Sequence, residues 1–293
     1  MPQESGEKTQ SRILSALDRS LRGFVERYGD TLLAGMEPRI EDAAAPDEIP
    51  APGRFLLQGR SYHPVAEACG RAVAELLELL RQSLPNLEPE VRRLAHLFES
   101  EQIDAARFLV LVLSNQGNTL IQLCRQFQLR EDLLILFAVF LARSYRSKAA
   151  GNLAGRIDLG AWDRGYCPVC GHWPSLAHID DGQGKRTLWC LQCTTVWPYP
   201  RLRCVFCFHE DQEQLEILHP EADPKLRVQA CKLCRRYIKE VRTEEPPASF
   251  LFDAVYLGTG PLDLIAINAG YFQESALAVR FSGTDGLRAD QAE

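Results

Sequence analysis

The sequence has no apolar run long enough to cross a bilayer. Its longest uninterrupted apolar stretch, residues 133–142, has 10 residues, whereas a transmembrane helix needs about 20. We therefore expect a buried helix there and no membrane insertion. The first ten residues, MPQESGEKTQ, also lack the apolar core of a secretory signal peptide.

The sequence also lacks the motifs that identify a catalytic or phosphate-binding site. The sequence shows no Ser/His/Asp or Cys/His arrangement for nucleophilic catalysis. Gly258, Thr259 and Gly260 form a glycine-rich turn, but no glycine follows at the spacing that a phosphate-binding loop requires. The sequence therefore assigns no catalytic residues and no residues that would bind an organic cofactor.

The chain also lacks the dense basic stripe that is typical of a nucleic-acid-binding surface. It carries 33 Lys and Arg against 39 Asp and Glu, a formal charge of −6. Residues 164–242 hold 12 basic and nine acidic side chains, which is only a mild asymmetry. Nucleic-acid binding is therefore kept as an alternative and is not the favoured function.

Cysteine is the residue that the chain uses in an unusual pattern. Eight of its ten cysteines form four CxxC pairs: Cys167/Cys170, Cys190/Cys193, Cys204/Cys207 and Cys231/Cys234. Two thiolates separated by two residues approach one metal ion from one side, and two such pairs complete a tetrahedral site. Four pairs therefore predict two mononuclear tetrathiolate metal sites. Sites closed by four protein ligands leave no open position for substrate, which argues against hydrolytic metal chemistry.

Other uses of paired cysteines fit this spacing less well. A disulfide framework needs an oxidising compartment and usually a small secreted domain, whereas this chain has 293 residues. A thioredoxin-like motif uses a single CxxC in a βαβ setting, and iron–sulfur runs commonly include a lone distal cysteine. The regular pairs favour mononuclear iron or zinc, and reduced thiols favour the cytoplasm.

Strand-forming segments alternate with the cysteine pairs and predict two small ribbon-like modules. Between the first two pairs, residues 173–179 and 185–189 flank a turn at 180–184. We predict sequential pairing, in which the first CxxC joins the second and the third joins the fourth. A cross-braced pairing of the first with the third stays open. Further strands are predicted at 194–197, 215–218, 226–229 and 237–241.

The first half of the chain has helical spacing instead. Apolar residues recur at this spacing in residues 13–28, and the stretch 31–60, rich in Pro, Ala and acidic residues, predicts a loop or extended arm. Cys69 and Cys124 lie on predicted helices without a partner nearby and are expected to be small core residues. The helices are predicted at 64–83, 89–99, 103–115, 120–127 and 131–147, close enough together to form one compact domain.

These patterns predict an α+β protein. Four histidines in the metal region are expected at the surface or around the ligands, because cysteines already complete both sites: His172, His178, His209 and His219. A helix is expected at 261–271, and residues 250–257 read as strand or helix. The predicted divisions are an N-terminal helix and arm (1–60), a helical domain (61–163), a first metal module (164–203), a second metal module (204–245) and a C-terminal segment (246–293).

Four segments stand out around the cysteines: CPVCGHWP (167–174), CLQCTTVW (190–197), RLRCVFC (201–207) and CKLCRRYIK (231–239). They resemble the cysteine segments of a known family, the formate dehydrogenase accessory proteins FdhE. The resemblance implies a cytoplasmic accessory protein, not an enzyme, that binds the catalytic subunit of a respiratory formate dehydrogenase before export. It also implies rubredoxin-like sites, so iron is favoured over zinc on this ground alone. Electron transfer and zinc-ribbon nucleic-acid binding are the alternatives.

We predict about two metal ions per chain, because eight cysteines supply two sets of four ligands. Elemental analysis of anaerobically purified protein checks this count, and less than one ion per chain would refute it. With sequential pairing, Cys167→Ser should empty one site and leave the other loaded. Continued protection of Cys204 against alkylation in this variant would show that its site keeps the metal.

Overall fold

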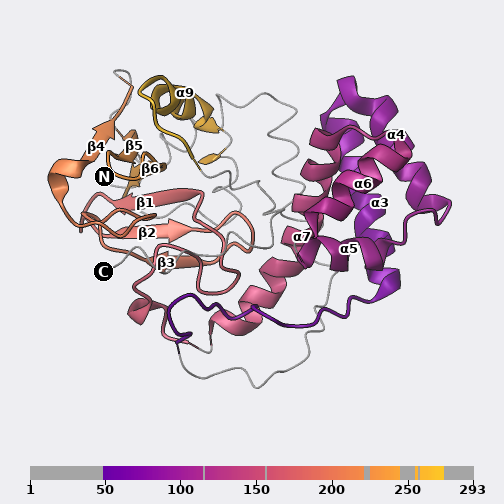
Figure 1. Cartoon of the computed structure of the whole chain (residues 1–293), viewed down its shortest axis with the longest axis horizontal. Coiled ribbons are helices and arrows are strands. Elements are labelled where there is room, and N and C mark those ends of the chain that lie inside the picture. Colours follow the sequence, from indigo (N-terminus) through magenta and orange to yellow (C-terminus); the bar gives the residue numbers. More distant parts are fainter. Residues whose placement is uncertain are drawn as a thin grey trace.

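The computed structural model describes residues 49–114, 116–155, 157–220, 225–244, 255–256 and 258–273. In these residues, helices form one half and a mixed β-sheet forms the other (Figure 1), which confirms the predicted α+β class. The helix predicted at 13–28 lies outside the described residues. So do residues 31–48 of the predicted arm and most of the segment 250–257.

Five α-helices form the helical half at the positions that the apolar spacing predicted. Their side chains meet in one core, in which Cys69 and Cys124 are buried as expected. No helix among the described residues has both the length and the apolar character required to cross a membrane. The helices are α3 (Ala66–Ser83), α4 (Glu88–Glu99), α5 (Ala105–Leu113), α6 (Gly117–Phe127) and α7 (Glu131–Ala154), with a short 3₁₀ turn at Pro85–Leu87.

Helix α7 runs beyond its predicted end at residue 147 and enters the β half. Its earlier residues, such as Phe137, lie in the helical core, whereas Ala149, Ala150 and Leu153 pack in a second core with the cysteine-bearing segments. All of its residues from Phe137 to Arg146 are buried. A helix that is buried all round has no polar face to mark its limits, so the sequence pattern did not show where this one ends.

Two buried arginines of α7 hold the β half against the helix. Arg146 donates a hydrogen bond of 2.8 Å to the Oε1 atom of Gln192, which lies inside the second CxxC. The guanidinium of Arg143 lies over the ring of Trp189, 5.6 Å from its centroid. The two halves are therefore joined by side-chain contacts as well as by the chain.

The β half is a single six-stranded sheet with the order β3-β2-β1-β6-β5-β4. Neighbouring strands are antiparallel, except that β1 and β6 run parallel, with Leu176 opposite Lys239. The strands around the first two CxxC pairs and those around the last two thus meet at β1 and β6. The strands are β1 (Leu176–Asp180), β2 (Arg186–Trp189), β3 (Val196–Pro198), β4 (Leu215–Leu218), β5 (Leu226–Cys231) and β6 (Tyr237–Thr243), with 3₁₀ turns at Leu159–Ala161 and Gln212–Gln214.

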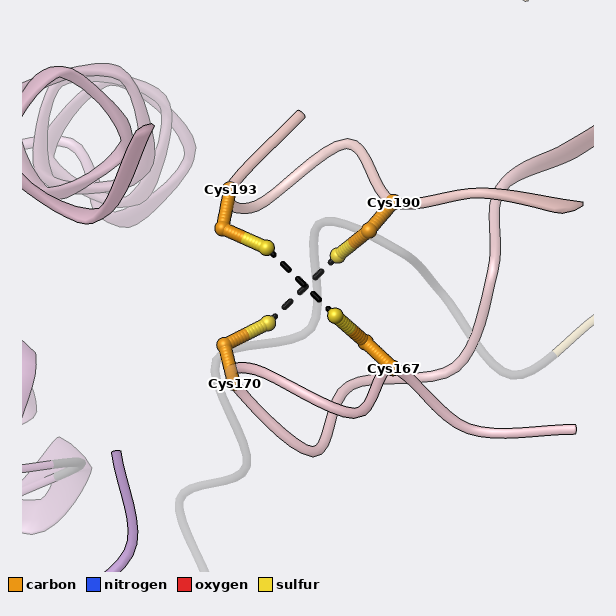
Figure 2. A group of neighbouring side chains, drawn as sticks. All are labelled: Cys167, Cys170, Cys190 and Cys193. Carbon is orange, nitrogen blue, oxygen red and sulfur yellow. Dashed lines mark hydrogen bonds between the residues drawn. The ribbon is translucent and has the colours of Figure 1, made fainter. Parts of the chain in front are cut away.

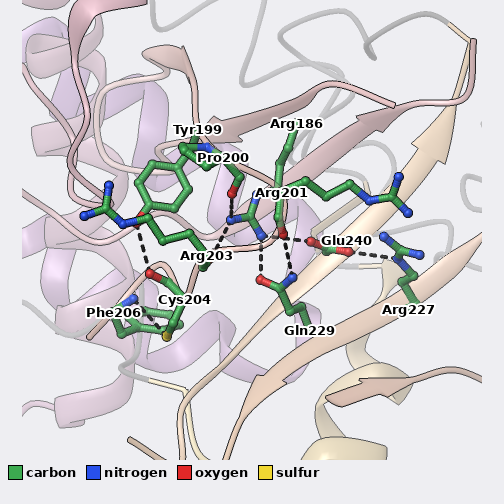
Figure 3. A network of polar contacts seen from close by, with 10 residues as sticks. All are labelled: Arg186, Tyr199, Pro200, Arg201, Arg203, Cys204, Phe206, Arg227, Gln229 and Glu240. Carbon is green, nitrogen blue, oxygen red and sulfur yellow. Dashed lines mark hydrogen bonds and ion pairs between the residues drawn. The ribbon is translucent and has the colours of Figure 1, made fainter. Parts of the chain in front are cut away.

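A buried ion network crosses this junction (Figure 3). Glu240 on β6 accepts from Arg186 on β2 at 3.2 Å and from Arg227 on β5 at 2.8 Å. The side chains of Arg186 and Glu240 are both fully buried. A buried charge is costly unless it is paired and hydrogen-bonded, so this network fixes which strands lie together.

The same arginine also holds the linker between the second and third CxxC pairs. Arg186 donates to the carbonyl oxygens of Pro200 and Arg203, the second at 2.7 Å. Gln229 on β5 donates to the carbonyl oxygen of Arg201 at 2.9 Å and accepts from Arg186 at 2.5 Å. The linker is thereby held by side chains from strands of both hairpins.

Helix α9 (Gly260–Asn268) lies against β5 and β6, where the sequence predicted a helix at 261–271. Asp263 of this helix accepts from the phenol of Tyr237 at 2.9 Å and from the buried ammonium of Lys239 at 3.0 Å. Burial lowers the pKa of Lys239, and the neighbouring Asp263 carboxylate opposes that shift. This pair anchors α9 to the sheet.

We predict that Glu240→Gln lowers the free energy of unfolding by about 3–5 kcal/mol, because two arginines then lose their buried counter-charge. Urea denaturation followed by circular dichroism measures the change. Glu67→Gln is the matched control, since Glu67 pairs with Arg71 on the exposed face of α3 and such pairs contribute little. Equal stability of the Glu240→Gln variant and this control would contradict the role of the network.

Candidate metal centres

The eight cysteines come together as two groups of four. The first cysteine group is Cys167, Cys170, Cys190 and Cys193, and the second cysteine group is Cys204, Cys207, Cys231 and Cys234. Within each group all sulfur atoms lie within 4.8 Å of one another. The grouping follows sequential pairing and not the cross-braced alternative. Among the described residues, these are the two clusters whose side chains could hold a metal ion.

The dimensions of both groups fit a tetrahedral ion. In the first, Cys167 and Cys193 have their sulfur atoms 3.4 Å apart, Cys170 and Cys190 have theirs 3.5 Å apart, and all four point to a common centre (Figure 2). In the second, two sulfur–sulfur distances are 3.7 Å. A metal ion with bonds of 2.3 Å to four sulfurs places the sulfurs about 3.8 Å apart. A disulfide would need about 2 Å, and all ten cysteines are free.

All four CxxC loops have the same backbone hydrogen bonds. The N–H of the first cysteine donates to the carbonyl oxygen five residues later, and the N–H four residues later donates back to the carbonyl of that cysteine. The residue four positions after the first cysteine has a left-handed conformation in every loop. These residues are Gly171 (φ 75°), Thr194 (φ 61°), Phe208 (φ 62°) and Arg235 (φ 60°).

Only the first loop has a glycine at this position, so the sequence did not reveal that the four loops share one conformation. A side chain in the left-handed region costs roughly 1–2 kcal/mol, and each of the three has contacts that offset this. Thr194 donates to the carbonyl of Cys193 at 2.7 Å. The ring centroids of Phe208 and Trp173 are 6.3 Å apart. The guanidinium of Arg235 lies over the ring of Tyr271, 4.5 Å from its centroid.

The proton affinities of the thiols differ within each group. Burial raises the pKa of Cys167 and Cys170 well above the ordinary range. Burial also acts to raise the pKa of Cys193, but hydrogen bonds from the other thiols and from the hydroxyl of Thr195, 3.1 Å away, outweigh it and lower this pKa. Buried thiols crowded in this way do not all ionise unless a cation compensates their charge.

In the second group, hydrogen bonds from Cys204 and Cys234 lower the pKa of Cys207 to about 2. The hydrogen bonds with Cys207 and Cys234 instead raise the pKa of the Cys204 thiol. The backbone N–H of Phe206 also points at the sulfur of Cys204, at 3.4 Å. In each group, therefore, the hydrogen bonds between thiols favour the thiolate form at one cysteine, Cys193 or Cys207.

An aromatic contact and a close backbone approach connect the two groups. The ring centroid of Trp173, just after the first CxxC, lies 5.4 Å from that of Phe206, which is inside the third CxxC. Gly165 lies so close to the backbone of Val205 that a Cβ atom there would be 1.8 Å from the Val205 carbonyl oxygen. All four cysteines of the first group, and Cys204 and Cys231 of the second, belong to one hydrophobic cluster.

The two groups differ in exposure. The residues of the first group are all buried, whereas in the second Cys207 is exposed and Cys234 is half-buried. Residues 53–57, which we call the strap, cover the first group. Leu56 and Leu57 donate to the carbonyl oxygens of Pro168 and Val169 at 2.9 and 2.8 Å. In Figure 1 the strap belongs to the indigo segment that begins beneath β3 and runs to the helical half.

The four histidines predicted to lie at the surface or around the ligands occupy different positions. His172 and His209 supply the backbone carbonyls that close the first and third CxxC loops. His178 is buried on β1 with its Nε2 atom 2.9 Å from the hydroxyl oxygen of Thr243, and His219 is exposed. None of the four belongs to either cysteine group. Cys69 and Cys124 are also separate, and burial raises the pKa of Cys69 to about 11.

Known proteins that are similar to this chain include FdhE proteins. No protein-family model matches the chain. The chain is similar to an FdhE homolog from Aquifex aeolicus, with 38% identity over 114 residues that cover 37% of the chain and 39% of that protein. It is similar to FdhE of Escherichia coli O1:K1 / APEC, with 34% identity over 236 residues that cover 75% of the chain and 66% of that protein.

The fold also has a counterpart among solved structures. The crystal structure of the FdhE protein from Pseudomonas aeruginosa superimposes with a TM-score of 0.58 and 20% identity, covering 91% of this chain and 92% of that one. This similarity shows a shared fold. The match to the Aquifex relative spans only about two fifths of its length.

We predict that Gly171→Ala lowers the free energy of unfolding by at least about 1–2 kcal/mol, because alanine is strained at this positive φ. The new Cβ would also lie 2.4 Å from the Cδ1 atom of Phe55 in the strap. Gly70→Ala is the matched control: it lies inside α3 with open space around its Cβ position, and there alanine should stabilise the helix. Urea denaturation of both variants measures the two opposite shifts, and equal shifts would contradict the strain argument.

Proposed function

Because this chain belongs to the FdhE family, we propose that it is a cytoplasmic accessory protein that binds the catalytic subunit of a respiratory formate dehydrogenase during assembly, before export. In this role it does not turn over formate. The observation that supports the proposal most strongly is the pair of closed four-cysteine groups in a chain of this family. Closed sites leave no position for a substrate, which suits binding more than catalysis.

The proposed centres are two mononuclear tetrathiolate metal ions, with iron favoured and zinc as the alternative. The proposed ligands are the eight cysteines of the two groups. When bound, the metal would add folding free energy to the packing of the loops in their shared hydrophobic cluster. The cytoplasm is the proposed location, because thiols kept for metal binding require a reducing compartment.

Exposed loops on a rigid scaffold often carry recognition, and the fourth CxxC loop has this character. Leu233, between Cys231 and Cys234, is 53% exposed. The apolar residues inside the other loops are buried, for example Val169 and Leu191. We therefore include the fourth loop in the proposed surface for the client enzyme.

We predict that Leu233→Glu strongly reduces recovery of a tagged formate dehydrogenase catalytic subunit, because it places a charge in the proposed apolar contact. Co-purification from cells under reducing, anaerobic conditions measures the effect. Leu264→Glu is the matched control, since Leu264 is equally apolar and 63% exposed but lies on α9.

Equal recovery of the client with both variants would remove the fourth loop from the interface. No recovery with the unaltered protein would refute the client itself. Formate oxidation by the purified protein alone would refute the accessory role.

Electron transfer is the second candidate function, and the exposed Cys207 favours it, since a sulfur at the surface shortens the path to a partner. Iron held by four thiolates can alternate between ferrous and ferric states, whereas zinc has no redox chemistry. A reversible redox titration of the iron-loaded protein would support this role.

A further inference from the structure

We propose that the two cysteine groups have different tasks: the first holds its metal ion permanently, and the second exchanges its ion with thiol or chelating ligands that approach at Cys207. This inference rests on the metal-binding part of the proposed function. It goes further by assigning exchange to one centre and by naming the residues that seal the other.

The first group is sealed on the side of its first CxxC loop. The strap adds two backbone hydrogen bonds to that loop, from Leu56 and Leu57. Gly53 adds a third contact by donating to the phenol oxygen of Tyr166 at 2.8 Å. Phe55 lies so close to Gly171 that a single added carbon would collide with it. An incoming ligand must displace the strap before it can reach these sulfurs.

The second CxxC loop closes the other side of the first group. Leu191 in this loop is 4% exposed, and its neighbour Gln192 accepts the hydrogen bond from the buried Arg146 of α7. Access from this direction requires separation of the helical half from the β half. The first group is therefore enclosed by elements from three parts of the chain.

The second group has an open side. Cys204 and Cys231 are buried at 2% exposure, but Cys207 is exposed and Cys234 is half-buried. Lys232 and Leu233 beside them are both exposed. A ligand can therefore approach the metal position past Cys207 without any movement of secondary structure.

The exchange step follows from this geometry. An incoming thiolate forms a bond to the metal ion as the bond between the metal and the Cys207 sulfur breaks. The proton that the incoming thiol has lost goes to the buffer, and the Cys207 sulfur leaves as a thiolate, so charge and protons balance. The three remaining cysteines hold the ion during the step, and it leaves only when further ligands replace them.

The zinc-loaded full-length protein provides the test, with excess 4-(2-pyridylazo)resorcinol as the chelating probe. Zinc release should occur in two phases of one equivalent each, with the fast phase at least about tenfold faster, because exchange from a covered site requires local opening. Cys207→Ser should accelerate the fast phase, because three cysteines then hold that ion and one position is already open, and should leave the slow phase unchanged. Phe55→Ala should accelerate the slow phase and leave the fast phase unchanged.

A second measurement needs no variant. Pulsed alkylation of the zinc-loaded protein, read by mass spectrometry, should label Cys207 and Cys234 first and the first group last. Release in a single phase, or earlier labelling of the first group, would overturn the proposal. Failure to load two zinc ions would refute both this proposal and the metal sites of the proposed function, whereas two ions that leave together would refute this proposal alone.

Discussion

Sulfur atoms packed in fours are the constraint on which the β half depends. Each group places four thiols within 4.8 Å of one another, and thiolates at such distances repel unless a cation lies between them. A cation bound between them would remove this repulsion and would therefore also stabilise the folded loops. Each CxxC loop has one residue in the left-handed conformation, because the backbone must turn tightly to bring its two sulfurs together. Three of the four loops accept a side chain in that conformation.

The second organising feature is the parallel pairing of β1 with β6. It unites the hairpins of the two cysteine groups in one sheet. The buried ion network of Arg186, Glu240 and Arg227 lies across the joined strands, and it also holds the linker between the groups. Neither group is therefore an independent unit in space, even though each is contiguous in sequence.

This arrangement gives the two centres unequal surroundings. The first group lies between the strap and the end of α7, while the second lies at the surface with Cys207 exposed. The first group packs where the two halves meet, whereas the second group faces solvent at Cys207 and Leu233.

The sequence by itself determined the α+β class, the approximate positions of the helices and strands, and the eight clustered cysteines. These follow from local signals: apolar periodicity for α3 to α7, strand-forming segments on both sides of the turn at 180–184, and the two-residue spacing that lets a loop curl around one ion. Sequential grouping was also favoured by the sequence, because each hairpin brings its own two CxxC pairs together.

The tertiary structure alone decided the parallel β1–β6 contact, the continuation of α7 into the second core and the covering of the first group by the strap. Each depends on contacts between residues far apart in the chain, such as Leu57 with Val169 or Glu240 with Arg186. Local spacing does not encode such contacts. They arise because every buried backbone group and charge must find a partner wherever the packed chain provides one.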